Sequence, residues 1–132
     1  MADFPDGLLY TKDHEWAKVE GNRVRVGITS FAVEQLGDIT LVSFDVKVGD
    51  EVAAGKTFGT IESVKTLSDL FAPVAGKIVE INQALDKSPE LVNEDCYGKA
   101  WMVVLETKTP PKSDGAGLLD PTAYAAHVKA ST

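Results

Sequence analysis

Short segments of β-forming residues, separated by glycine turns at close spacing, run from Leu8 to Leu105 of this chain. This pattern is typical of a small sandwich or barrel. Polar or small residues alternate with Val24, Val26 and Ile28 in one of these segments, so one face should be buried and the other exposed to water. The predicted strands cover residues 16–20, 23–28, 39–44, 56–62, 67–72, 76–81 and 100–105. We therefore expect a mainly β fold.

Short helices should connect some of these strands. Ser30 is placed to cap a helix over residues 31–36, and Gly37 follows it as a left-handed stop. A single helical turn is predicted at Ser88-Pro89-Glu90-Leu91, because a capping residue precedes a proline there. Both are connectors between strands.

The composition changes after Glu106, where a stretch rich in proline and glycine is predicted to be a linker. Asp120 followed by Pro121 then predicts a C-terminal helix with Tyr124 and Val128 on one face. We expect residues 1–106 to form the β-domain, and the linker and helix of residues 107–132 to pack on the same domain.

Bulk properties exclude several classes of partner. The 132 residues suit a single domain, and a formal charge of −7 disfavours nucleic acid and anionic membrane surfaces. No apolar run approaches the roughly 18 residues of a membrane span. The acidic N-terminus matches neither a secretory signal nor a transit peptide. A single cysteine, Cys96, favours a reducing compartment, either a bacterial cytoplasm or, for a processed eukaryotic chain, the mitochondrial matrix.

Motifs for catalysis and metal binding are missing from the sequence. His14 and His127 are the only histidines, and neither has a second ligand at metal spacing, so we expect no metal site. No glycine-rich phosphate loop is present, and neither serine nor cysteine is paired with a local histidine in a catalytic motif.

The most informative segment is Gly59 to Gly76, where β-forming residues flank Val64-Lys65. This arrangement predicts two strands joined by a tight turn with Lys65 at its tip. A lysine in such a position is usually just solvated. Here, however, the acidic residues Glu62 and Asp69 flank it as an acidic collar, and Lys65 is the only basic residue between them. A modifying enzyme could recognise a projecting lysine of this kind by its shape.

These residues resemble a known family. Glu62-Ser63-Val64-Lys65, followed by Ser68-Asp69 and Pro73-Val74, is similar to the lipoyl-attachment hairpin of glycine cleavage H proteins. Further blocks look like that family in the same order, and together they cover most of the chain from Leu8 to Leu105. They are Tyr10 to Trp16, Val26 to Thr29, Leu36 to Ile39, Val79 to Asn82, and Leu91 to Gly98 with Trp101.

The resemblance implies a hammerhead β-sandwich of the lipoyl/biotinyl type, with lipoic acid in amide linkage to Lys65. It implies a carrier and not an enzyme, which shuttles the aminomethyl group of glycine from a glycine decarboxylase to an aminomethyltransferase. Electrons would pass to a dihydrolipoyl dehydrogenase, and a lipoate ligase or octanoyltransferase would attach the cofactor. By the same analogy we expect a monomer.

The family also folds its loaded arm into a cleft on the carrier. Carried over to this sequence, Glu15 and Asp69 are the candidates to hold the amine, because a cation that leaves water needs a carboxylate partner. The alternatives are an ordinary strand-edge charge at Glu15 and a brace of the hairpin at Asp69.

Some residues depart from the family pattern. Thr66-Leu67 are bulkier than the usual small pair after the lysine, and Cys96 stands where proline is typical. Cys96 is interpreted as a buried small hydrophobe, with a reactive thiol as the alternative.

Three other functions remain open at this point. A biotinyl carrier uses a similar hairpin, although its lysine is normally flanked by methionines and not by Val64 and Thr66. An H-like relay that hands lipoyl groups to other proteins would use the same lysine. The third is an interaction module in which Lys65 is never modified.

Overall fold

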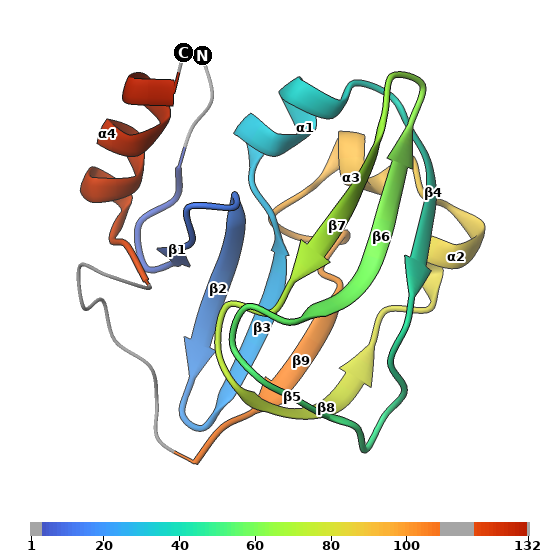
Figure 1. Ribbon diagram of the computed structural model, residues 1–132, viewed down its shortest axis with the longest axis vertical. Helices are drawn as coiled ribbons and strands as arrows, with labels where there is room; N and C mark the ends of the chain where they lie inside the picture. The colour runs from blue at the N-terminus through green and yellow to red at the C-terminus, as the bar shows by residue number, and fades with distance from the viewer. Residues whose placement is uncertain (1–3, 109–117, 132) are drawn as a thin grey trace.

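Two antiparallel sheets face each other in the computed structural model, which describes residues 4–108 and 118–131 (Figure 1). One sheet has six strands in the order β1-β2-β3-β9-β8-β5, and the other has three in the order β4-β6-β7. The six-stranded sheet contains β1 (Leu9–Tyr10), β2 (Glu15–Glu20), β3 (Arg23–Ile28), β9 (Val103–Glu106), β8 (Gly76–Ile81) and β5 (Glu51–Val52). The three-stranded sheet contains β4 (Ile39–Phe44), β6 (Thr57–Ser63) and β7 (Leu67–Phe71).

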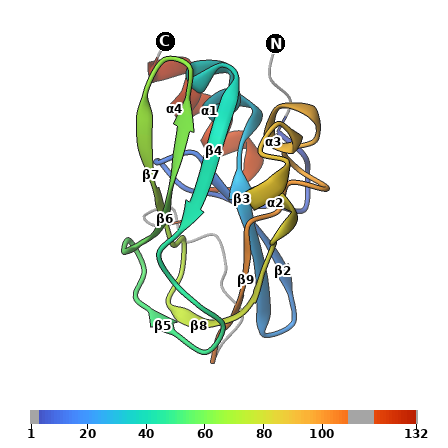
Figure 2. The same ribbon diagram turned by 90° about the vertical axis from the view of Figure 1, so that its right-hand side faces the viewer.

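The helices are short and lie around the sandwich. They are α1 (Ser30–Leu36), α2 (Ala84–Lys87), α3 (Leu91–Glu94) and α4 (Pro121–Ser131). Figures 1 and 2 show α1 and α3 at the same end of the molecule as the turn between β6 and β7, with β5 and β8 at the other end. The predicted mainly β fold with short connecting helices is confirmed.

The core fills the space between the sheets. The six-stranded sheet contributes Val24, Val26 and Leu105, while Phe58 and Ile61 come from the three-stranded sheet, and all are at most 1% exposed. Burial of these side chains on both inner faces holds the two sheets together, since removal of apolar area from water dominates the stability of such a packing.

A second cluster attaches the C-terminal helix. The rings of Tyr10 and Tyr124 stack with centroids 4.7 Å apart, and Leu119 pairs with Tyr10 through two backbone hydrogen bonds. Asp120 Oδ1 accepts the backbone N–H of Ala123, which confirms the predicted cap. The predicted packing face is confirmed, because Tyr124 is buried and Val128 packs against the same cluster. Residues 109–117 of the predicted linker lie outside the described residues.

Two predicted helices differ in detail from the observed ones. The side chain that caps α1 is Thr29, whose Oγ1 accepts the N–H of Ala32, and Ser30 is instead the first helical residue. A helix at α2 was not predicted, and the turn at α3 begins at Leu91, after the predicted proline start.

The last strand begins at Val103, three residues later than predicted. Asn82 binds the segment that precedes this strand, because its backbone N–H donates to the carbonyl of Met102. Its side-chain Nδ2 donates to the carbonyls of Lys99 and Trp101. These carbonyls are therefore bonded to a side chain and not to a neighbouring strand.

A glycine is required at position 27 because the buried Trp16 ring lies against it. Gly27 and Trp16 are opposite each other in β3 and β2, and a Cβ atom at Gly27 would lie 2.6 Å from two carbons of the indole ring. We predict that Gly27→Ala lowers the free energy of unfolding by roughly 1–3 kcal/mol, as overpacking of a filled core does. Urea denaturation would measure this. In a Trp16→Leu background the cost should shrink, and an equal cost in both backgrounds would contradict the explanation.

Candidate functional site

Lys65 lies in the turn between β6 and β7, as predicted. Figure 1 shows this turn at one end of the molecule. The backbone N–H of Ser63 donates to the carbonyl of Thr66 over 2.8 Å, and the two residues between them, Val64 and Lys65, form the turn. Lys65 is exposed, and no carboxylate of the described residues forms an ion pair with it. Its amine is therefore accessible to a modifying enzyme.

Ser63 closes the turn with its side chain. Its Oγ accepts the backbone N–H groups of Lys65 and Thr66, each over 3.2 Å. Hydroxyl side chains stabilise turns in this way without a left-handed residue. His14 is the only non-glycine residue with positive φ in the described parts of the chain, so neither Val64 nor Lys65 is strained. This explains how the hairpin forms without the glycine that tight two-residue turns usually contain.

The turn also rests on the connection between α1 and β4. The N–H of Val64 donates to the carbonyl of Asp38 over 3.0 Å. A Cβ atom at Gly37 would lie 3.5 Å from Cε of Lys65, so the aliphatic part of the lysine lies against this glycine. The stem of the lysine is thus supported, while the residue as a whole stays exposed.

One face of the hairpin combines apolar and acidic side chains. Leu41, Glu62 and Leu67 are opposite one another across β4, β6 and β7, and opposite residues share a face of the sheet. The two leucines are 40% and 59% exposed, and Val64 at the tip is 68% exposed. Asp69 is exposed on the same face, two residues along from Leu67. The predicted acidic side chains therefore lie on one face of the hairpin that carries Lys65, together with an apolar surface that the sequence reasoning missed.

Glu15 is buried between the two sheets. It is 2% exposed, and its carboxyl group accepts the Thr11 hydroxyl over 2.6 Å and the N–H of Phe71, at the end of β7, over 3.5 Å. Loss of solvent raises the pKa of Glu15 to about 8, although the bond from Thr11 opposes this. A strand-edge charge was the alternative for Glu15, and the burial shows that it was wrong.

Glu15 and Asp69 lie on different strands, Glu15 at the start of β2 and Asp69 in β7. No hydrogen bond among the described residues joins them, but Phe71, which contacts Glu15, follows Asp69 by two residues in this strand. Strand β7 therefore links the lysine turn at one end with a buried carboxyl group at the other.

A polar network beside Glu15 was missed by the sequence reasoning. The Tyr124 hydroxyl lies 2.8 Å from Nδ1 of His14 and 2.8 Å from Oγ1 of Thr29. Burial lowers the pKa of His14, and the nearby His127 lowers it further. These residues are far apart in the sequence, and no periodic pattern or motif connects them.

Cys96 is half-buried, and burial raises the pKa of its thiol to about 11. A thiol that stays protonated at neutral pH is a poor nucleophile, which favours the packing role over the reactive one. Residues 4–108 and 118–131 contain no group of three or more histidine, cysteine or acidic residues that could hold a metal ion.

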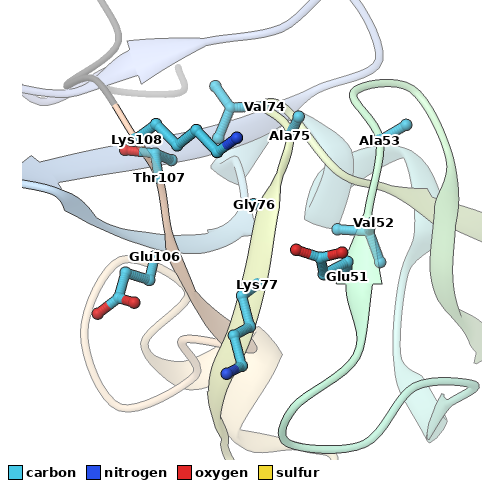
Figure 3. Close-up of a pocket in the computed structure, with 10 residues that line it drawn as sticks. All are labelled: Glu51, Val52, Ala53, Val74, Ala75, Gly76, Lys77, Glu106, Thr107 and Lys108. Carbon is cyan, nitrogen blue, oxygen red and sulfur yellow. The ribbon is translucent and has the colours of Figure 1, made fainter.

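A pocket lies away from Lys65, among β5, β8 and the end of β9 (Figure 3). It has a volume of about 850 Å³, and charged groups of both signs line it, including Glu51, Lys77 and Glu106. It contains none of the predicted site residues, so its size alone does not connect it with the chemistry of the hairpin.

Comparisons with known proteins agree on one family. A family model described as "Glycine cleavage H-protein" matches residues 8–131. A glycine cleavage system H protein from Halalkalibacterium halodurans is 57% identical over 106 residues, which are 80% of this chain and 82% of that protein. One from Bacteroides thetaiotaomicron is 52% identical over 126 residues, 96% of this chain and 98% of that protein.

A solved structure has the same fold. The crystal structure of a glycine cleavage system H protein from Mycobacterium marinum superposes with a TM-score of 0.85 at 39% sequence identity. The match covers 96% of this chain and 99% of that one. The described helices give no candidate membrane span, and the longest, α4, has 11 residues.

Proposed function

We propose, from the premise that this chain belongs to the glycine cleavage H-protein family, that Lys65 is the residue that bears its lipoyl group. As an H protein the chain is a lipoyl carrier of the glycine cleavage system. The observation that supports Lys65 is its exposed amine on a hydrogen-bonded turn, free of any ion pair with a described carboxylate. An amide at this nitrogen would remove the charge and extend the side chain into a flexible tether.

The residues around Lys65 fit such a group. The lysine is exposed at the tip of the turn, and Gly37 leaves room for its stem. When attached, the lipoyl group supplies the sulfur chemistry of aminomethyl and electron transfer. The chain itself would make and break no bonds, and its residues would position the tether and hold the amine of the cargo.

Its proposed partners are the glycine decarboxylase, the aminomethyltransferase and the dihydrolipoyl dehydrogenase of the same system. A lipoate ligase or octanoyltransferase would modify Lys65. Because Leu41, Val64 and Leu67 are exposed beside acidic Glu62, such partners should present an apolar surface with basic groups at its edge. Tethering would give an effective concentration on the order of millimolar at a docked partner.

Glu15 and Asp69 are proposed to hold the amine of the loaded arm. An arm that starts at Lys65 and follows β7 would pass Asp69 and end near Phe71, where the carboxyl group of Glu15 lies. A cationic amine that enters this partly buried site would favour ionisation of Glu15, because opposite charges stabilise each other at low dielectric. The proposal therefore explains why a carboxyl group is kept in an unfavourable position.

Variants of these two residues should shorten the lifetime of the loaded arm. We expect Glu15→Gln and Asp69→Ala each to speed hydrolysis about tenfold, as the loss of one charge-assisted hydrogen bond does. Single-turnover decay of the loaded form would measure the rate. Glu51→Ala, an exposed acidic residue at the other end of the molecule, is the matched control. An unchanged lifetime in both site variants would remove this role.

The attachment site itself can be tested by mass. Protein from a lipoate-replete host should carry a lipoyl increment on the peptide that contains Lys65, seen by intact and peptide mass spectrometry. A biotin increment would support the biotinyl carrier instead. No increment would support the interaction module.

Two further assignments are proposals of the same kind. We propose that residues 1–106 form the carrier domain and residues 107–132 an extension packed on it, which the contacts of Tyr124 with Tyr10 support. A bacterial cytoplasmic location is supported by the bacterial origin of the relatives and by the single cysteine, Cys96.

A further inference from the structure

We propose that Asn93 is a positioning residue for the acylation of Lys65. Asn93 belongs to α3 and is 28 residues later in the sequence than the lysine. The inference rests on the proposed role of Lys65 as the attachment site, and it concerns how the fold presents that lysine to the enzyme that modifies it.

Asn93 clamps the connection between α1 and β4 with both ends of its amide. Its Nδ2 donates to the carbonyl of Gly37 over 2.9 Å, and its Oδ1 accepts the N–H of Ile39 over 2.9 Å. The two bonded residues lie on either side of Asp38. Since Gly37 is the residue with positive φ that ends α1, the clamp fixes the chain at the point where it changes direction.

The clamped segment is the one on which the lysine turn rests. The carbonyl of Asp38 accepts the N–H of Val64 over 3.0 Å, and the stem of Lys65 lies against Gly37. The turn is therefore held by its own hydrogen bonds through Ser63 and by this external support, which depends on a loop held by Asn93.

Loosening this loop should make Lys65 harder to recognise without altering the lysine itself. When only a fraction of a substrate is in the conformation that its enzyme binds, the apparent affinity is reduced by that fraction. The free energy needed to order the loop and the lysine turn then opposes binding of the enzyme and raises KM. The chemistry of the bound amine, and with it kcat, is unchanged. Loss of two side-chain hydrogen bonds corresponds to a change of roughly tenfold in such an equilibrium.

The test compares Asn93→Ala with Asn82→Ala, a variant of a second bridging asparagine. The side chain of Asn82 donates to the carbonyls of Lys99 and Trp101 over 2.8 and 2.7 Å. None of its hydrogen bonds to described residues reaches the β6–β7 hairpin. The purified full chain, wild type or variant, is acylated by a lipoate ligase with lipoate and ATP. Initial rates give kcat and KM, urea denaturation gives stability, and amide hydrogen exchange reports on the N–H of Val64.

For Asn93→Ala we expect KM to rise about tenfold with kcat within about twofold of wild type, and faster exchange at Val64. Asn82→Ala should lose at least as much stability as Asn93→Ala. It should nevertheless keep the wild-type KM and the wild-type rate of amide hydrogen exchange at Val64. Measurements are made below the unfolding transition of both variants.

Two results would overturn the positioning role: a wild-type KM for Asn93→Ala, or an equal rise in KM for both variants, which would reflect general loss of stability. If the wild-type chain itself is not acylated at Lys65, the proposed function fails and this inference fails with it. Acylation of wild type with no effect of Asn93→Ala overturns the inference alone.

Discussion

Lys65→Arg is expected to abolish lipoylation of the chain and its support of glycine cleavage. Arginine keeps the positive charge and most of the length, and the turn is closed by Ser63 and the backbone of Thr66, which the substitution does not touch. A guanidinium group stays protonated at neutral pH, so it cannot act as the nucleophilic amine that acylation requires. The variant should therefore fold normally and stay unmodified.

Intact mass spectrometry and reconstituted glycine decarboxylation would measure this result. The lipoyl increment should be absent, and turnover with the partner enzymes should fall to the background without carrier. Lys56→Arg is the matched control, because Lys56 is an exposed lysine at the opposite end of the same hairpin. A lipoyl increment that survives in Lys65→Arg would place the attachment elsewhere. Modified wild-type protein that fails to support turnover would instead favour the relay role.

Glu15→Gln is expected to stabilise the protein at neutral and alkaline pH. Burial raises the pKa of Glu15 from 4.5 to about 8 in the folded chain, whereas the unfolded chain releases the proton near 4.5. Between these values the folded state binds more protons, so the free energy of unfolding falls as pH rises. The difference between these two pKa values corresponds to a loss of roughly 3–5 kcal/mol in the free energy of unfolding, which is complete above about pH 8. Glutamine has the shape of the protonated acid and no proton to lose.

Urea denaturation of both proteins between about pH 4 and pH 9 would test this prediction. The difference between the two curves should be small near pH 4 and should grow in favour of Glu15→Gln up to about pH 8. The lowered pKa of His14 acts in the opposite direction, since it costs stability below its ordinary value of 6.5, but it is common to both proteins and cancels in the difference. A difference that does not depend on pH would show that Glu15 is already ionised in the fold.

The Glu15 result would also separate stability from function. The same substitution should make the free carrier more stable and its loaded arm shorter-lived, because the carboxyl group that is costly without cargo is the proposed partner of the amine. A residue that served only as a structural brace would change both properties in the same direction. Opposite signs in the two measurements would therefore support a functional carboxyl group.

The hairpin could be predicted from sequence because its signals are local. β-forming residues flank Val64 and Lys65 within a few positions, and Ser63 stands where it can close the turn. The cap at Asp120 is also a local pattern, and it is confirmed. The predicted alternation in β3 holds over residues 23–26, but Gly27 on the predicted wet face is buried against the Trp16 ring. The cap of α1 was misplaced by one residue, since Thr29 and Ser30 are both good capping residues and only the backbone decides between them.

The surroundings of the lysine could not be predicted in the same way. The burial of Glu15 arises where β2 of one sheet meets the end of β7 of the other, and the contact joins residues 15 and 71. The clamp from Asn93 to Gly37 likewise spans 56 positions. Such contacts depend on how the two sheets pack, which no pattern within a short window of sequence contains.

The support of the Val64–Lys65 turn from outside the hairpin limits how far the carrier can be reduced in size. A synthetic peptide of residues 57–71 would include both strands and Ser63 but neither the carbonyl of Asp38 nor the segment behind it. Isolated two-stranded hairpins are only marginally stable in water. Inhibitors or labelling tags that imitate this lysine would therefore need the scaffold that orders it, and not merely the residues on either side of it.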